Sequence, residues 1–69
     1  MTVGERIRYA RKERGMTQAK LAELCDLTPP VICHYEQGDW EPTLFNATSI
    51  AIALDISVDW LVGLSDKKA

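Results

Sequence analysis

Residues 18–35, QAKLAELCDLTPPVICHY, constrain the fold of this chain more than any other segment. Their apolar spacing predicts two short helices joined by a tight turn. Thr17 caps the first helix and Thr28 caps the second. Asp26 is expected to end the first helix near a left-handed backbone conformation, which aspartate tolerates less easily than glycine. Two helices joined in this way can place the second one in the major groove of DNA.

Three further helices are predicted around this pair. Capping signals and apolar spacing place them at about 3–14, 44–54 and 58–62. No segment alternates apolar and polar residues in the manner of a strand. The fold class is therefore all-α, with five helices in one compact domain over residues 1–69 and a frayed tail at 65–69.

The second helix of the pair has an unusual beginning. Pro29 suits the first helical position, because its missing N–H would have no partner there. Pro30, however, biases Pro29 toward extended dihedrals, so we expect this helix to start late or unevenly. Ile32 and Tyr35 are expected to face the core. In the preceding helix the expected inward residues are Leu21, Ala22, Leu24 and Cys25.

Length and composition limit the class of protein. A chain of 69 residues has a small core, so its stability is low or is shared with a partner subunit. No apolar run approaches the roughly 20 residues that cross a membrane, and the charged start lacks the apolar segment of a secretory signal. We expect a cytoplasmic protein in which Cys25 and Cys33 are reduced.

The charge is divided unevenly along the chain. The formal net charge is −2, yet residues 1–20 carry +4 and residues 21–69 carry −6. Such a division can direct one face of a protein toward phosphates. It is equally consistent with ordinary solvated helix surfaces.

The order of these signals resembles the lambda-type repressor and Cro family of helix-turn-helix DNA-binding proteins. The resemblance covers residues 3–64 and is carried by GERIRYARKERGMTQAKLAEL, Ile32, Tyr35-Glu36-x-Gly38, Pro42-Thr43 and the segment 50–61. It implies a five-helix lambda-repressor-like domain. It also implies a dimeric transcriptional regulator, of the repressor kind, that binds a pseudo-palindromic operator in double-stranded DNA.

The resemblance assigns DNA contacts to matching positions. Gln18 is implied to meet a phosphate at the start of its helix, where free N–H groups favour an anion. Gln37 is implied to contact another phosphate. Lys12 and Lys20 are expected either to reach phosphates or to be solvated. The full set of expected DNA-binding residues is Gln18, Thr28, Pro29, Pro30, Val31, His34, Gln37, Lys12, Lys20, Thr43 and Asn46.

Base recognition is expected from the helix that follows Thr28. The family places polar side chains at its first two positions, whereas this chain has two prolines that cannot donate. Pro30 and Val31 can still touch a thymine methyl group. His34 is the best hydrogen-bonding side chain on this face, and the alternative is a solvated surface histidine.

The loop after this helix departs from the family pattern. Asp39 and Glu41 stand where basic or small polar residues are common, and their carboxylates repel phosphates. Beside DNA binding, this leaves an alternative function open, a protein-interaction module that keeps the fold but has little DNA affinity. In that case Trp40 and Phe45 would contact a protein partner.

Two further roles follow from the resemblance. Arg11 and Glu36 match an ion pair that ties two helices together. The region of the fifth helix matches the family's two-fold contact, so a homodimer interface is expected at Val58, Trp60 and Leu61. Phe45, Ile52, Trp40 and Trp60 either form an exposed patch in such an interface or are scattered apolar surface residues.

No catalytic or cofactor chemistry is expected. One histidine and no paired carboxylates in a pocket argue against an enzyme. Cys25, Cys33, Asp26 and His34 lack the spacing of paired metal ligands, so no metal site is expected. The four glycines are dispersed, and no phosphate-binding glycine loop or other cofactor motif is present.

Overall fold

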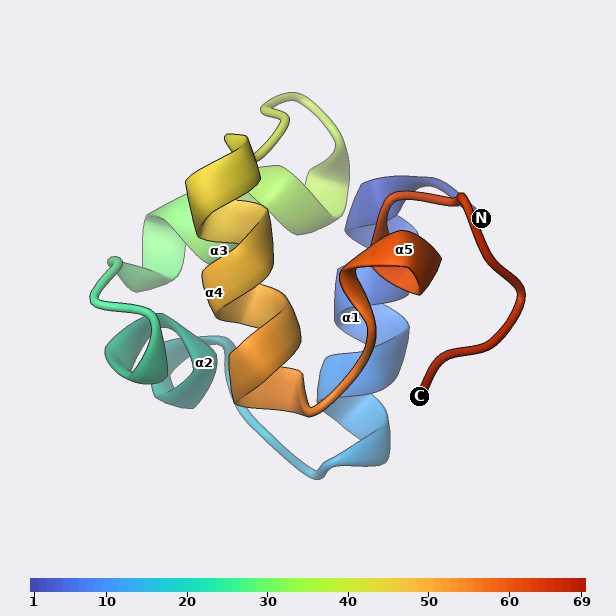
Figure 1. The fold of residues 1–69 in the computed structure, drawn as a ribbon. Coiled ribbons are helices and arrows are strands. Elements are labelled where there is room, and N and C mark those ends of the chain that lie inside the picture. The colour runs from blue at the N-terminus through green and yellow to red at the C-terminus, as the bar shows by residue number, and fades with distance from the viewer.

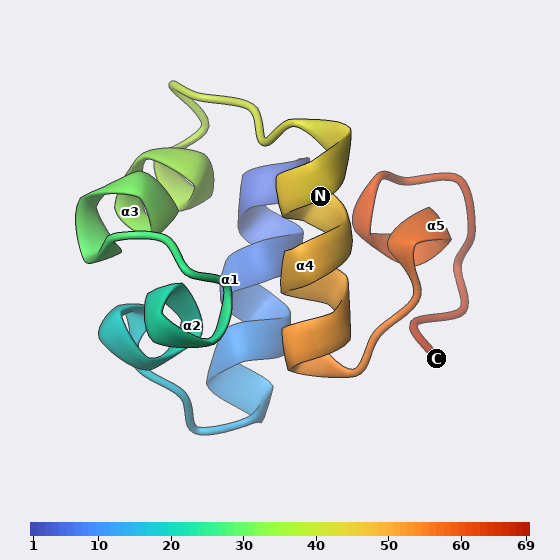
Figure 2. The same ribbon diagram turned by 60° about the vertical axis from the view of Figure 1, so that its left-hand side comes forward.

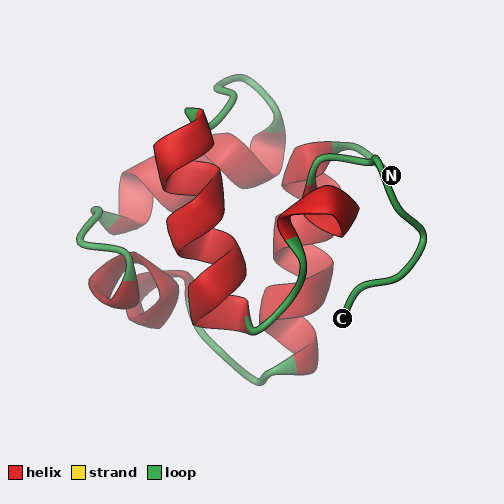
Figure 3. Ribbon diagram, viewed as in Figure 1, coloured by secondary structure: helices red, strands yellow, loops and turns green.

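The computed structural model describes all residues, 1–69, and contains five helices and no strand (Figures 1 and 3). The helices are α1 (Val3–Glu13), α2 (Gln18–Leu24), α3 (Pro29–Gln37), α4 (Leu44–Leu54) and α5 (Val58–Leu61). In Figure 2, α1 and α4 lie in the middle, α2 and α3 on one side and α5 on the other. The predicted all-α fold is confirmed. No helix is both long and apolar enough to span a bilayer.

Side-chain caps start four of the five helices. Thr2 and Glu5 form a reciprocal capping box at α1, with Thr2 N–H donating to Glu5 Oε1 at 2.8 Å. The hydroxyl oxygens of Thr17, Thr43 and Ser57 accept from backbone N–H groups at α2, α4 and α5. Such caps are each worth about 1 kcal/mol.

The start of α3 is capped in another way. Thr28 occupies the cap position, but its side chain makes no capping hydrogen bond. Pro29 and Pro30 have no N–H to offer, and the N–H of Val31 donates to the carbonyl of Thr28 at 3.1 Å. The helix nevertheless begins regularly at Pro29, so the expected late or uneven start is wrong.

Every helix contributes to the core. The largest fully buried side chains are Ile7, Leu21, Ile32, Ile50, Leu54 and Leu61. Burying each aliphatic side chain of this size stabilises the fold by about 1.5–3 kcal/mol. Leu24 was expected in this core but is 49% exposed, because α2 turns Leu21 and Ala22 inward and leaves Leu24 beside a surface groove along α4.

The turns between helices use left-handed backbone conformations. Asp26, in the turn between α2 and α3, has φ of 56°, as expected from the sequence. Gly38 ends α3 with φ of 87°, a conformation that glycine adopts without a steric penalty. The chain therefore reverses sharply after α3, and Asp39 and Trp40 fold back toward that helix.

The C-terminal tail was expected to be frayed, but it packs against α1 and α5. The N–H of Ser57 donates to the carbonyl of Lys68 at 2.7 Å, and its hydroxyl donates to the carbonyl of Lys67 at 3.1 Å. Lys68 pairs with Glu13 and lies 5.0 Å from the ring centre of Tyr9. These contacts join residues far apart in sequence, so local composition does not reveal them.

Candidate nucleic-acid interface

The outward face of α3 is open to solvent. Ile32 and Tyr35 point into the core, and the helical period places Pro30 and Gln37 on the opposite side. Thr28, Pro29, Pro30 and Gln37 are exposed, and His34 is half-buried. This face lies on the side of the molecule away from α5 and the C-terminus (Figure 2). It is therefore free to contact a large partner.

A bidentate ion pair fixes α3 against α1. Arg11 Nε donates to Glu36 Oε2 at 2.6 Å, and Nη2 donates to Oε1 at 2.9 Å. A third donor, Nη1, bonds to the carbonyl of Met16 at 2.8 Å. The two side chains are only 9% and 3% exposed, and the hydrogen bonds that Arg11 donates to the carboxylate of Glu36 raise the pKa of Arg11. The ion pair thus forms between Arg11 and Glu36, the two residues for which the resemblance implied it.

Gln18 belongs to the same network. Its Nε2 donates to Glu36 Oε1 at 3.0 Å, so the amide holds the start of α2 to α3. This bond uses one of the two amide hydrogens, so the phosphate contact expected of Gln18 stays a prediction. The backbone N–H groups at the start of α2 remain the better candidates, because the first turn of a helix leaves them without helical partners.

Close backbone packing sets the distance between α1 and α3. Gly4 faces the carbonyl groups at the end of α3, and a Cβ built there would lie 2.2 Å from the carbonyl oxygen of Tyr35. Real Cβ atoms do not approach this closely. Glycine therefore allows α1 to support the C-terminal end of α3 directly.

Several expected contact residues make internal bonds. Asn46 Nδ2 donates one of its two hydrogens to the hydroxyl of Tyr35 at 3.0 Å, and the phosphate contact expected of Asn46 stays a prediction. Gln37 Nε2 donates to Cys33 Sγ at 3.4 Å. Thr43 accepts one bond through its hydroxyl and keeps the hydroxyl hydrogen to donate. Val31, expected to be exposed, is half-buried because it packs on the core.

The basic surface beside this face is smaller than the sequence suggested. Arg11 forms the buried ion pair with Glu36, Arg14 pairs with Asp55, and Lys20 pairs with Glu23 at 3.0 Å. Of the basic side chains on α1, Lys12 is exposed and has no ion-pair partner.

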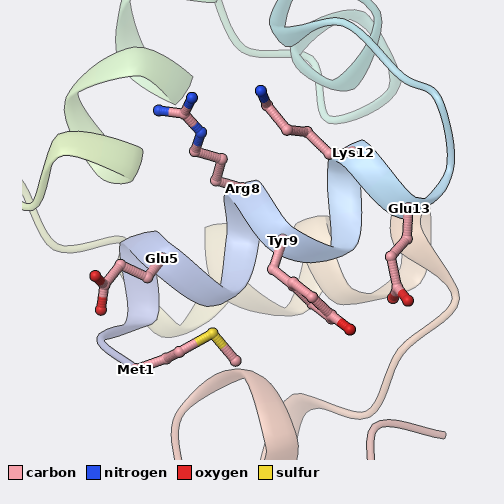
Figure 4. A pocket seen from close by; sticks show the side chains of 6 residues that line it. All are labelled: Met1, Glu5, Arg8, Tyr9, Lys12 and Glu13. Carbon is pink, nitrogen blue, oxygen red and sulfur yellow. The ribbon is translucent and has the colours of Figure 1, made fainter.

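Arg8 is a cation that the sequence interpretation missed. It is exposed and unpaired, and Figure 4 shows it extending to the same side of α1 as Lys12, away from Glu13. The spacing of four residues between Arg8 and Lys12 is the signal that would have found it. Together the two cations form the main unpaired basic surface of α1.

His34 is held by two residues of the following loop. Its Nδ1 lies 2.9 Å from Asp39 Oδ2, and its ring stacks on Trp40 with ring centres 4.0 Å apart. The imidazole side chain is 37% exposed. It is thus neither a freely solvated histidine nor a core residue.

The expected dimer interface is largely internal. Trp60 is 7% exposed and Leu61 is fully buried, so neither can supply the contact expected of it. Trp60 is held by Arg6, whose Nη1 donates to the carbonyl of Trp60 at 3.1 Å and whose guanidinium lies over its ring. Val58 is half-buried, while Val62 and Leu64 near it are exposed.

Of the four apolar residues expected either in a patch or scattered over the surface, Trp60 is buried and Trp40 is 49% exposed. Phe45 and Ile52 on α4 are 79% and 75% exposed. Leu44 is also exposed and borders a surface groove of about 320 Å³ that is lined by Val3, Glu41, Pro42, Leu44, Ala47 and Val62. The groove joins the start of α4 to the end of α5.

Comparison with known proteins places this geometry in a family. The helix-turn-helix family matches residues 7–61. The immunity repressor protein of Bacillus phage phi105 is 41% identical over 63 residues, which are 91% of this chain and 44% of that protein. The HTH-type transcriptional regulator DicA of Escherichia coli K12 is 38% identical over 69 residues, 99% of this chain and 51% of that protein. This chain therefore spans about half the length of these curated relatives.

A solved structure shows the same fold. The P22 c2 repressor, crystallised with a synthetic operator, superimposes with a TM-score of 0.89 and 31% identity. The superposition covers 94% of this chain and 98% of that one.

Proposed function

The chain belongs to the helix-turn-helix family, and on that premise we propose that it binds double-stranded DNA with α3 in the major groove. One observation carries this proposal. The outer face of α3 is exposed while its inner face is locked to α1 by the buried pair of Arg11 and Glu36. A rigid helix with one free side is what groove recognition requires. Relatives named as repressors favour transcriptional repression as the outcome.

The phosphate contacts are proposed for residues around α3. The unpaired cations Arg8 and Lys12 and the hydroxyl of Thr43 are the free donors near it. Lys20 joins them if DNA displaces Glu23, because an exposed ion pair contributes little. Each cation that meets a phosphate releases counterions, so binding should weaken as salt rises.

Base recognition is proposed for the exposed face of α3. Pro30 offers an apolar surface that suits the methyl group of thymine. His34 offers one free ring nitrogen, because the other is bonded to Asp39. Gln37 is exposed and keeps its amide oxygen and one amide hydrogen for DNA, because the bond to Cys33 uses only the other hydrogen.

We also propose that the protein acts as a homodimer joined near α5. This end of the molecule lies away from α2 and α3, so pairing there leaves both α3 helices exposed (Figure 1). Val58, Val62 and Leu64 are the accessible apolar residues, in place of the internal Trp60 and Leu61. Leu64→Glu should raise the monomer fraction in sedimentation. Ile52→Glu, on α4, is the matched control and should leave the mass unchanged.

Fluorescence anisotropy with random and selected duplexes tests the proposed function. Arg8→Ala and Lys12→Ala should each weaken binding to all sequences, and each should reduce the salt slope by about one. Lys67→Ala is the control, since Lys67 is an exposed cation whose carbonyl accepts a hydrogen bond from Ser57, the cap of α5. Wild-type protein that shows no salt-sensitive binding to any duplex would overturn the proposal.

A second candidate is a protein-interaction module that keeps the fold. It is favoured by the carboxylate of Glu41 and by the exposed apolar side chains of Phe45 and Ile52. Glu41→Lys separates the two functions. A DNA regulator should bind more tightly with its sequence preference kept, whereas an interaction module should gain only binding that ignores sequence.

A further inference from the structure

His34, Asp39 and Trp40 form a unit that the proposed function does not explain by itself. The left-handed turn at Gly38 brings the carboxylate of Asp39 to 2.9 Å from Nδ1 of His34. The same turn stacks the indole of Trp40 on the imidazole, with an angle of 23° between the rings. A hydrogen bond and a stacked ring together fix both the position and the rotation of the imidazole.

The hydrogen bond also selects the tautomer of His34. An ionised carboxylate only accepts hydrogen bonds, so the proton of the neutral imidazole must be on Nδ1. Nε2 then carries a lone pair. It makes no hydrogen bond within the protein and is not among the buried polar atoms that lack a partner, so it remains accessible to solvent.

A lone pair on this face has a definite recognition chemistry. In the major groove only adenine N6 and cytosine N4 present amino hydrogens, whereas guanine and thymine present acceptor oxygens. We propose, resting on the proposed function, that His34 Nε2 accepts a hydrogen bond from the amino group of an adenine or cytosine. Asp39 and Trp40 are its positioning residues. Asp39, whose carboxylate repels the phosphates of DNA, thereby sets the base preference of His34.

The tautomer is tested first, on the free protein without DNA. Long-range ¹H–¹⁵N NMR in alkaline buffer distinguishes a protonated ring nitrogen from one with a lone pair. We expect a protonated Nδ1 and an unprotonated Nε2 in the wild type. Asp39→Ala should give a mixture of tautomers. A wild-type spectrum with the proton on Nε2 overturns the inference, whatever the DNA experiments show.

The base preference is tested second, by binding to a duplex selected from a random library. At the base pair that His34 contacts, replacing the preferred amino-bearing base should cost the wild type about tenfold in affinity. If that base is adenine, its purine analogue without the amino group should cost as much. His34→Ala should bind both duplexes equally. Trp40→Ala should lower the ratio between the duplexes, and Trp40→Phe should restore it by keeping the stacking.

The matched control separates positioning from charge. Asp39→Ala and Glu41→Ala each remove one carboxylate from the same loop, so both should raise affinity for all DNA. Of these two variants, only Asp39→Ala should reduce the tenfold affinity ratio between the preferred and the altered duplex toward one. If the wild type binds DNA and Asp39→Ala keeps the ratio, the inference is wrong and the proposed function stands. If the wild type binds no DNA, both fall.

Discussion

Removing the charge of Glu36 should destabilise the fold more than any exposed charge change. Glu36→Gln keeps the shape of the side chain but leaves the Arg11 guanidinium, in a residue 8% exposed, without its counter-charge. One of the two oxygens that accept from Arg11 and Gln18 also becomes a donor. Breaking a buried pair from one side typically costs 3–5 kcal/mol, and we expect about 3 kcal/mol here because one acceptor remains.

This loss is large for so small a domain. A chain of this length has a free energy of unfolding of about 3–10 kcal/mol. Each kcal/mol shifts the Tm of so small a domain by about 4–8 °C, so Glu36→Gln should lower Tm by about 12–24 °C. Urea denaturation followed by circular dichroism measures it. Glu23→Gln is the control, since its exposed pair with Lys20 should be worth less than about 0.5 kcal/mol.

The same reasoning predicts the behaviour of a double variant. Arg11→Met with Glu36→Leu removes both charges together and fills their space with apolar atoms, so it should recover most of the loss. If Glu36→Gln costs less than about 1 kcal/mol, or if the double variant is no more stable than Glu36→Gln, the buried pair does not hold α3 as described.

Other changes test separate parts of the structure. Gly4→Ala should cost about 3 kcal/mol in urea denaturation because its Cβ meets a backbone carbonyl of α3, and Gly15→Ala, at an open site with φ of 62°, should cost only about 1 kcal/mol. Hydrogen bonds lower the folded-state pKa of Glu5 and Glu13, so the stability that these bonds supply is present above the usual pKa and is lost as pH falls through the lowered values. The Tm of the wild type should therefore fall between about pH 5 and pH 3. The Tm of a variant with glutamine at both positions should fall less over the same range. Leu61→Glu should abolish the cooperative thermal transition rather than merely produce folded monomers, because this side chain is fully buried.

The sequence predicts the helices well because their signals are local. Threonine and serine caps, the glycine after α3 and the apolar spacing of α1 and α4 each act within a few residues. The left-handed turn at Asp26 follows from the same local logic. These features depend on hydrogen bonds and steric contacts between residues that are close together in the chain, so they can be predicted from the sequence alone.

The errors occur where contacts are long-range. α5 is only four residues long, too short for periodicity to show that Trp60 and Leu61 both point inward. The order of the tail depends on Ser57 and on Lys68 meeting Glu13 across the fold. None of these contacts leaves a pattern in nearby residues.

The candidate site shows the same division. The exposed start of α3 follows from the apolar spacing, which leaves Thr28 and the two prolines outside the core. The internal bonds of Gln18 and Asn46 depend on how α2 and α4 approach α3, so no local pattern in the sequence predicts them. The partnership of His34 with Asp39 requires the backbone reversal at Gly38, which no spacing rule specifies.

The most direct measurement of the central claim is an NMR titration of ¹⁵N-labelled protein with a duplex selected from a random library. We expect the largest amide shifts at the start of α2 and along residues 28–37, with small changes on α5 and the tail. Shifts gathered on the exposed face of α4 around Phe45 and Ile52, or no shifts at all, would contradict the placement of α3 in the groove.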